Sequence, residues 1–179
     1  KKFFSYANTV TTINFDKTSK GHGWVGIRYQ NNENEDFNEI VIHVKFKETN
    51  ATLQQETLGS LGVNLIYGAY FYADNPRILI ESLYDDISLD RLEIDMIDFS
   101  GPGFQYVDNR LMSLQLVKLG MTDAVIFNSE GNNMLPADIL YKKNIFAVRG
   151  SFRPVTKVNI DMFEQGLEMF NKDNACDSY

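Results

Sequence analysis

The sequence contains few of the residues that staple or anchor a protein: one cysteine, two histidines and four prolines among 179 residues. The lone Cys176 cannot form an internal disulfide, which excludes a disulfide-stapled secreted scaffold and favours a cytoplasmic location. No apolar run approaches the roughly 20 residues that span a bilayer, and the start lacks a signal-peptide pattern. We therefore expect a domain that folds without disulfide or metal and has no membrane span.

Basic residues are also scarce, since 17 Lys and Arg stand against 24 Asp and Glu, for a net charge of −7. This balance argues against a nucleic-acid partner and leaves a small-molecule nucleotide or self-association, in a homo-oligomer, as the expected partners. The 44% hydrophobic content and the length suit one globular domain over residues 1–179. Because the chain opens on Lys1 without Met and ends on a polar tail, we expect it to be a portion of a longer protein.

The first half of the chain predicts strands and then helices. Residues 1–47 contain three stretches rich in aromatic and β-branched residues, near 3–15, 24–29 and 40–46, which predict a small antiparallel unit. Residues 50–88 predict a helical pair, in which a long helix from Thr52 to about Tyr70 is followed by a second helix that opens at Asn75-Pro76. Three glycines each weaken the long helix by about 1 kcal/mol, which indicates close packing on a neighbouring element. They are Gly59, Gly62 and Gly68.

The second half predicts alternating strands and helices over residues 91–170. Strands are expected at 92–99, 124–127 and 145–148, and helices at 108–119, from Pro136 to Tyr141 and from about Thr156. Three successive β-loop-α units imply a mostly parallel sheet with right-handed crossovers. The predicted fold class is therefore α/β, with N-terminal antiparallel strands followed by a mostly parallel, Rossmann-like sheet.

One stretch, NIFAVRGSFRPVTKVNIDMF at 144–163, has a spacing that suggests chemistry. It predicts a strand, a glycine turn and a helix, the order in which open α/β sheets place a phosphate at a helix N-terminus. Glycine lets the backbone approach the ligand, and basic side chains add positive charge. The alternative is an ordinary strand-to-helix turn with surface Arg and Lys side chains. The candidate phosphate- or nucleotide-binding residues are Gly150, Ser151, Arg153, Thr156, Lys157 and Asn159.

A second candidate lies in the acidic strand that contains Asp95 and Asp98. Carboxylates at the end of a parallel strand are typical Mg²⁺ ligands, so these two residues are the candidate metal site. The alternative is a solvent-facing edge strand with Asp108 as the cap of the following helix. His22 and His43 lack a third ligand at usable spacing, which favours a loop contact and a half-buried strand residue over a metal site.

The segment GSFRPVTKVN at 150–159 resembles the Gly-x-Phe-x-Pro-x-(His or Thr)-x-x-His signature of the nucleotidyltransferase superfamily, in particular the NMN adenylyltransferases. The resemblance implies a Rossmann-like sheet, a nucleotide and Mg²⁺. Asn159 stands where that superfamily has a His that supports charge on the α-phosphate, and Asn is a poorer electrostatic stabiliser.

Several longer segments together resemble an uncharacterised bacterial family whose members are often labelled NMN or nicotinate-nucleotide adenylyltransferases or TonB-dependent receptors. This resemblance implies a longer protein and supplies no activity, and alternating strands and helices do not fit a receptor barrel. Two functional hypotheses therefore stand: a nucleotide-binding, nucleotidyltransferase-like protein, and a non-catalytic self-assembly or interaction module. The segments that carry the family resemblance are KGHGWVGIRYQ, IVIHVKF, LQQETLGSLGVNLIYGAYF, DRLEIDMIDFSGPGF, VDNRLMSLQL and LYKKNIFAVRGSFRPVT.

Overall fold

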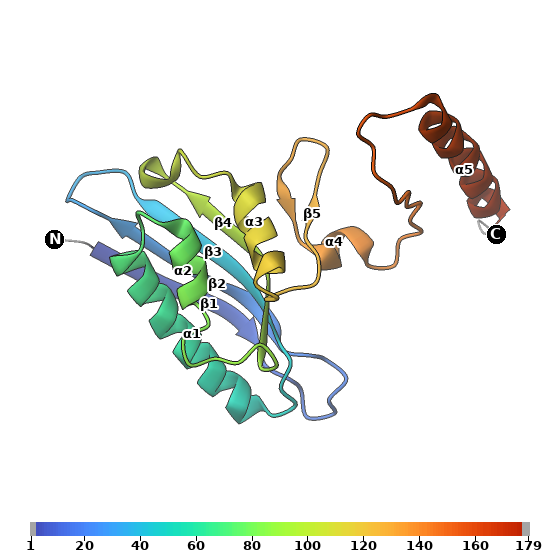
Figure 1. The fold of residues 1–179 in the computed structure, drawn as a ribbon. Coiled ribbons are helices and arrows are strands. Elements are labelled where there is room, and N and C mark those ends of the chain that lie inside the picture. The colour runs from blue at the N-terminus through green and yellow to red at the C-terminus, as the bar shows by residue number, and fades with distance from the viewer. Residues whose placement is uncertain (1–2, 177–179) are drawn as a thin grey trace. The chain divides into compact units, whose positions relative to one another are not determined.

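The computed structural model describes residues 3–176 and divides into two compact units, Lys1–Pro136 and Ala137–Tyr179. Unit 1 contains a four-stranded antiparallel sheet in the order β1-β2-β3-β4 (Figure 1). Its strands are β1 (Phe3–Thr11), β2 (His22–Gln30), β3 (Asn38–Phe46) and β4 (Leu92–Ser100). The first three strands follow one another along the sheet, whereas the connection from β3 to β4 contains two helices.

Local capping signals set where the helices of unit 1 begin. Asn50 accepts hydrogen bonds from Thr52 N and Leu53 N at the start of α1 (Ala51–Phe71). Asn75 and Pro76 open α2 (Pro76–Ser82), and Asp108 caps α3 (Asn109–Lys118). Side-chain acceptors at these positions satisfy N–H groups that have no partner inside the helix.

One hydrophobic core lies between the sheet and these three helices. Alternate residues of the central strands, such as Ile40, Ile42 and Val44 in β3, point into it and are fully buried. Leu61 and Leu65 of α1 and Leu116 of α3 belong to the same cluster. The remaining residues of each strand form the opposite face of the sheet, which we call the outer face.

The rest of the described chain consists of short or isolated elements. They are the 3-10 helix η1 (Pro102–Phe104), the two-residue strands β5 (Ile126–Phe127) and β6 (Asn133–Met134), α4 (Pro136–Leu140) and α5 (Lys157–Cys176). Strands β5 and β6 pair with each other, antiparallel. Within residues 3–176, no helix has the length and apolar character that crossing a membrane requires.

The expected parallel, Rossmann-like sheet is wrong. The three strands predicted in residues 1–47 are present and antiparallel, but β4 pairs antiparallel with β3, not parallel with a later strand. Residues 145–148 form no strand, and β5 is two residues long. Hydrophobic periodicity predicts where strands lie but not which strands pair with each other. The pairing of β3 with β4, which are separated in sequence by two helices, therefore could not be predicted from it.

The free edge of β4 has no room for a further strand because other groups already bond to it. Ile94 N donates to Met121 O at 3.2 Å, and Asn133 Nδ2 donates to Ile97 O at 2.9 Å. The Asn109 side chain pairs with both backbone groups of Phe99, accepting from N at 2.9 Å and donating to O at 3.0 Å. These contacts replace the ladder that a neighbouring strand would supply.

Candidate functional site

The predicted phosphate segment lies in unit 2 and begins without a strand, since residues 141–156 adopt neither helix nor strand. Gly150, Ser151, Arg153 and Lys157 are exposed. A Cβ built at Gly150 would lie 3.1 Å from the Phe152 ring, so this glycine makes room for a neighbouring side chain. The strand-turn-helix geometry that suggested a phosphate cradle is therefore absent.

Thr156 and Asn159 bond to each other at the start of α5. Thr156 N donates to Asn159 Oδ1 at 2.9 Å, and Asn159 N donates to Thr156 Oγ1 at 3.3 Å. Thr156 is the residue before α5 and Asn159 is the third residue within it, the arrangement of a reciprocal capping box. The two side chains expected to receive a phosphate thus already satisfy the first turn of their own helix.

A pocket of about 380 Å³ lies beside this helix start, and its character is apolar. Its lining includes Phe152, Ile160 and Phe163, with Glu164 as its one charged residue. Neither Arg153 nor Lys157 lines it. An apolar pocket with a carboxylate at its rim is a poor environment for a phosphate. Nucleotide binding by this segment stays a prediction.

The two candidate metal ligands, Asp95 and Asp98, have separate partners. Asp95 is 2% exposed and lies at a β-bulge between β3 and β4. Its Oδ1 is 2.6 Å from His43 Nδ1, and its Oδ2 is 2.6 Å from Lys45 Nζ. Among the residues that the structure describes, no group of three or more His, Cys, Asp and Glu side chains could hold a metal ion. The Mg²⁺ expected from the sequence therefore finds no assembled ligand set in this part of the chain.

The pKa values of the Asp95 and Asp98 carboxyl groups are shifted in opposite directions. Burial acts to raise the pKa of Asp95, but the hydrogen bonds from His43 and Lys45 outweigh it and the pKa falls below its usual value. Burial acts to lower the pKa of Lys45, but the hydrogen bond and charge of Asp95 raise it. Burial, together with the negative charge of Glu39, raises the pKa of Asp98. Asp95 is thus held as a carboxylate, whereas the charged form of Asp98 is disfavoured.

Aromatic rings cover the Asp95 cluster on the outer face of the sheet. The His43 ring lies 4.9 Å from the Trp24 ring and 5.7 Å from the His22 ring, measured between centroids. His22 belongs to β2, not to a loop, and His43 is 2% exposed, not half-buried. His43 and Lys45 therefore both bond to the buried Asp95 carboxylate, in a network that the sequence pattern did not reveal.

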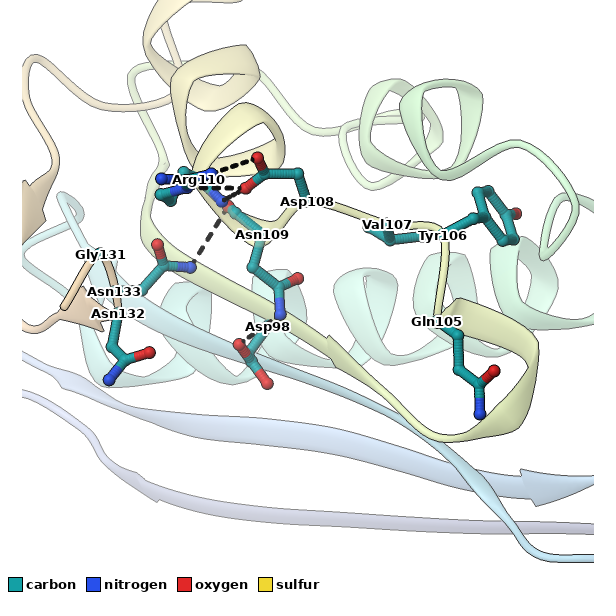
Figure 2. Close-up of a pocket in the computed structure, with 10 residues that line it drawn as sticks. All are labelled: Asp98, Gln105, Tyr106, Val107, Asp108, Asn109, Arg110, Gly131, Asn132 and Asn133. Atoms are coloured by element: carbon teal, nitrogen blue, oxygen red, sulfur yellow. Dashed lines mark hydrogen bonds and ion pairs between the residues drawn. The ribbon is translucent and has the colours of Figure 1, made fainter.

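A cavity of about 610 Å³ lies where β4, α3 and the β5–β6 turn meet (Figure 2). Asn109 Nδ2 donates to Asp98 Oδ1 at 2.7 Å, and Asn133 Nδ2 approaches Asn109 O at 3.3 Å. Arg110 forms two hydrogen bonds with the Asp108 carboxylate, at 3.0 and 2.8 Å. The lining residues are Asp98, Gln105, Tyr106, Val107, Asp108, Asn109, Arg110, Gly131, Asn132 and Asn133.

Several polar groups in this cavity are already bonded to one another, which limits what it can do chemically. Arg110 is paired with Asp108, so no free cation is offered to a phosphate by that side chain. Asp98 accepts from Asn109, and Asn109 is committed to the edge of β4. The sequence indicated Asp98 as a candidate metal ligand and Asp108 as a helix cap but gave no signal for Gly131 to Asn133. The cavity is best explained as the junction that fixes α3 and the β5–β6 turn onto β4.

Comparisons with protein-family models, curated proteins and solved structures found no significant match. The family resemblances seen in the sequence therefore stay predictions.

Proposed function

We propose that this chain is a non-catalytic assembly module that docks through its C-terminal unit, Ala137–Tyr179. One observation carries the proposal: none of the residues 137–173 is buried, although this unit contains a helix of 20 residues. A helix draws most of its stability from packing an apolar face, and an isolated one is marginal in water. Unit 2 therefore needs a surface that it does not itself provide.

The α5 helix presents an exposed apolar row at spacings of four and seven residues. Val158 is 74% exposed, Met162 48% and Met169 67%. Residues four and seven apart lie on one face of a helix, so the three side chains form one stripe. Two of the three are methionines, whose flexible side chains adapt to varied apolar surfaces.

A second apolar row on α5, which includes Phe163 and Phe170, is contacted by Phe146 in the segment before the helix. The Phe146 ring lies 5.6 Å from the Phe163 ring and 5.8 Å from the Phe170 ring. A Cβ at Gly166 would lie 2.7 Å from the same Phe146 ring, so glycine there permits the contact. The segment thus stabilises one side of α5 and leaves the stripe of Val158, Met162 and Met169 for another polypeptide. Helix-in-groove docking is the recognition mode that suits such a stripe.

Sedimentation velocity over a range of concentrations tests the proposal, together with amide hydrogen exchange of α5. We expect association with concentration, and slower exchange in α5 as it proceeds. Met169→Asp places a charge in the stripe and should weaken this association at least tenfold. Asn171→Asp adds the same charge to an exposed polar position of the same helix and should leave it unchanged.

Fast exchange throughout α5 at every concentration, together with identical sedimentation of the wild type and Met169→Asp, would count against the proposal. A cytoplasmic location, expected from the single cysteine, is part of the same proposal.

A further inference from the structure

The two edges of the main sheet differ. The edge at β4 is covered by Met121, Asn133 and Asn109 through the hydrogen bonds described above. The edge at β1 has no strand beside it among the described residues, and β1 pairs on one side with β2. The nine residues of β1, FFSYANTVT, include no charged residue, proline or glycine. Charged residues and proline are among the devices by which proteins usually protect an edge strand, so β1 is open to pairing.

Helix α1 runs along β1 on the inner face of the sheet (Figure 1). The Phe4 ring lies 5.7 Å from the Tyr70 ring near one end of β1. A Cβ at Gly62 would lie 2.8 Å from the Tyr6 hydroxyl, and Ile13 N donates to Gln54 Oε1 just beyond the other end. A partner that joins the β1 edge therefore meets α1 as well.

An exposed stripe on α1 faces away from α2. On the α2 side, Asn64 Nδ2 donates to Leu83 O, and Gly68 packs against Leu79. Residues spaced by three and four along the solvent side of α1 form this stripe: Val63 is 66% exposed, Ile66 39% and Tyr70 48%, and the Tyr70 ring contacts Phe4 of β1. Gly59 continues the stripe toward the N-terminus of the helix.

The contacts within the described chain account for the glycines at positions 62 and 68 of α1 but not for Gly59. Gly62 makes room for Tyr6, and Gly68 for Leu79 and Ser82. Apart from its chain neighbours and the backbone of its own helix, no atom of the described residues lies within 4 Å of a Cβ built at Gly59. Since a glycine weakens a helix interior, this position calls for a reason outside the fold. Close approach of a second helix is such a reason, because it needs a residue without a side chain.

Charge restricts which surface a second copy of the chain can use. Two copies of a chain with a net charge of −7 repel each other over most of their surfaces. β1 carries no charge, and the 21 residues of α1 contain one charged residue, Glu56. We infer that β1 pairs antiparallel with β1 of a second copy, joining two sheets into one of eight strands, with α1 packed against α1 through Gly59, Val63, Ile66 and Tyr70. This contact belongs to unit 1 and does not depend on the contact proposed for unit 2.

Sedimentation equilibrium of the full chain tests the inference with variants that separate folding from pairing. Gly59→Leu should raise the midpoint of unfolding of the monomer, since leucine favours helix, yet raise the dimer dissociation constant at least tenfold. Val63→Asp should also raise the dimer dissociation constant at least tenfold, because it places two carboxylates at the two-fold contact. Ile78→Asp is the matched control, because Ile78 is 43% exposed on α2, outside the proposed interface.

Amide exchange of β1 gives a second readout. In an unpaired edge strand, alternate amides point to solvent and exchange rapidly, whereas a strand paired on both sides protects every amide. We expect continuous protection across β1 in the wild type and an alternating pattern in Val63→Asp. Each measurement is repeated in the Met169→Asp background, where a dimer that persists is held by unit 1 alone.

A monomer at all concentrations with alternating exchange in β1 would overturn the inference. A dimer that Gly59→Leu and Val63→Asp leave intact would overturn it equally. Loss of association in Met169→Asp alone would assign the contact to unit 2 and remove it from β1.

Discussion

His43 Nδ1 lies 2.6 Å from Asp95 Oδ1, with both side chains buried on the outer face of the sheet, opposite the helices. Lys45 approaches the second oxygen of the same carboxylate at 2.6 Å and is itself partly exposed. Asp95 reaches both partners because the bulge in β4 shifts the register between His43 and Val44. A buried charge with two partners is costly to disturb from one side.

The first prediction concerns Asp95→Asn, which removes the negative charge and keeps the size of the side chain. We expect the free energy of unfolding at pH 7 to fall by about 1.5 to 3 kcal/mol, the usual value of hydrogen bonds to charged groups. Urea denaturation measures the change. Asp98→Asn is the control, because burial disfavours the Asp98 carboxylate and the substituted amide can still accept from Asn109. An equal loss in both variants would show that the network of Asp95 has no special role.

The second prediction is that the difference in unfolding free energy between wild type and Asp95→Asn depends on pH. The pKa of Asp95 is lowered by its partners in the folded protein, so its stabilisation is present above the unfolded value of about 3.9. It is lost as the pH falls through the lower, folded pKa. The gap in unfolding free energy between wild type and Asp95→Asn should therefore be constant near neutral pH and close below about pH 4. A gap that widens on acidification would contradict the assigned direction of the shift.

The third prediction compares two glycines in β2. A Cβ at Gly23 would lie 2.2 Å from Thr9 O and 2.6 Å from Val10 Cα, both backbone atoms of β1. Because a backbone cannot turn aside as a side chain can, Gly23→Ala should destabilise the protein by about 1 to 3 kcal/mol. Gly26→Ala is the control, since its nearest contact would be an ordinary 3.5 Å to Ile40 O. Thermal unfolding of both variants measures the difference, and equal midpoints would refute the close approach of β1 and β2 at Gly23.

The fourth prediction concerns Asn109, whose side chain covers the edge of β4 at Phe99. Asn109→Ala leaves the N–H and C=O of Phe99 and the carboxylate of Asp98 without this partner, which should cost about 1 to 3 kcal/mol. Amide exchange at Phe99 should also accelerate more than at Ile42 in the middle of the sheet. Asn132→Ala, at an exposed position of the same cavity, should have little effect. Unchanged exchange at Phe99 would show that water replaces the Asn109 contact without loss.

The starts of the helices in unit 1 were predictable because their signals are local. The predicted Asp108 cap, the opening of α2 at Asn75-Pro76 and the long helix after Asn50 all appear in the structure. The pairing of β3 with β4 was not predictable, because two helices separate these strands in the sequence and neither strand's sequence indicates its partner. Three units of strand and helix in succession then suggested the parallel sheet that the structure contradicts.

The candidate site was predictable in part for the same reason. The sequence predicts Asp98 as a candidate metal ligand and Asp108 as a helix cap, and both residues line the cavity. Asn133 reaches the same cavity from 36 residues beyond Ile97, a relation that only the fold reveals. The pairing of His43 with Asp95 depends on the strand register and on a bulge, neither of which a period-two pattern specifies.

The covered edge of β4 has a consequence for the stoichiometry of any complex built by strand addition. A sheet with two open edges adds copies without limit and grows into a fibre. When Met121, Asn109 and Asn133 occupy one edge, a chain that joins through β1 presents only covered edges to the next arrival. Growth of the main sheet by this route would then end at a pair, because contacts from three residues cover the other edge of the sheet.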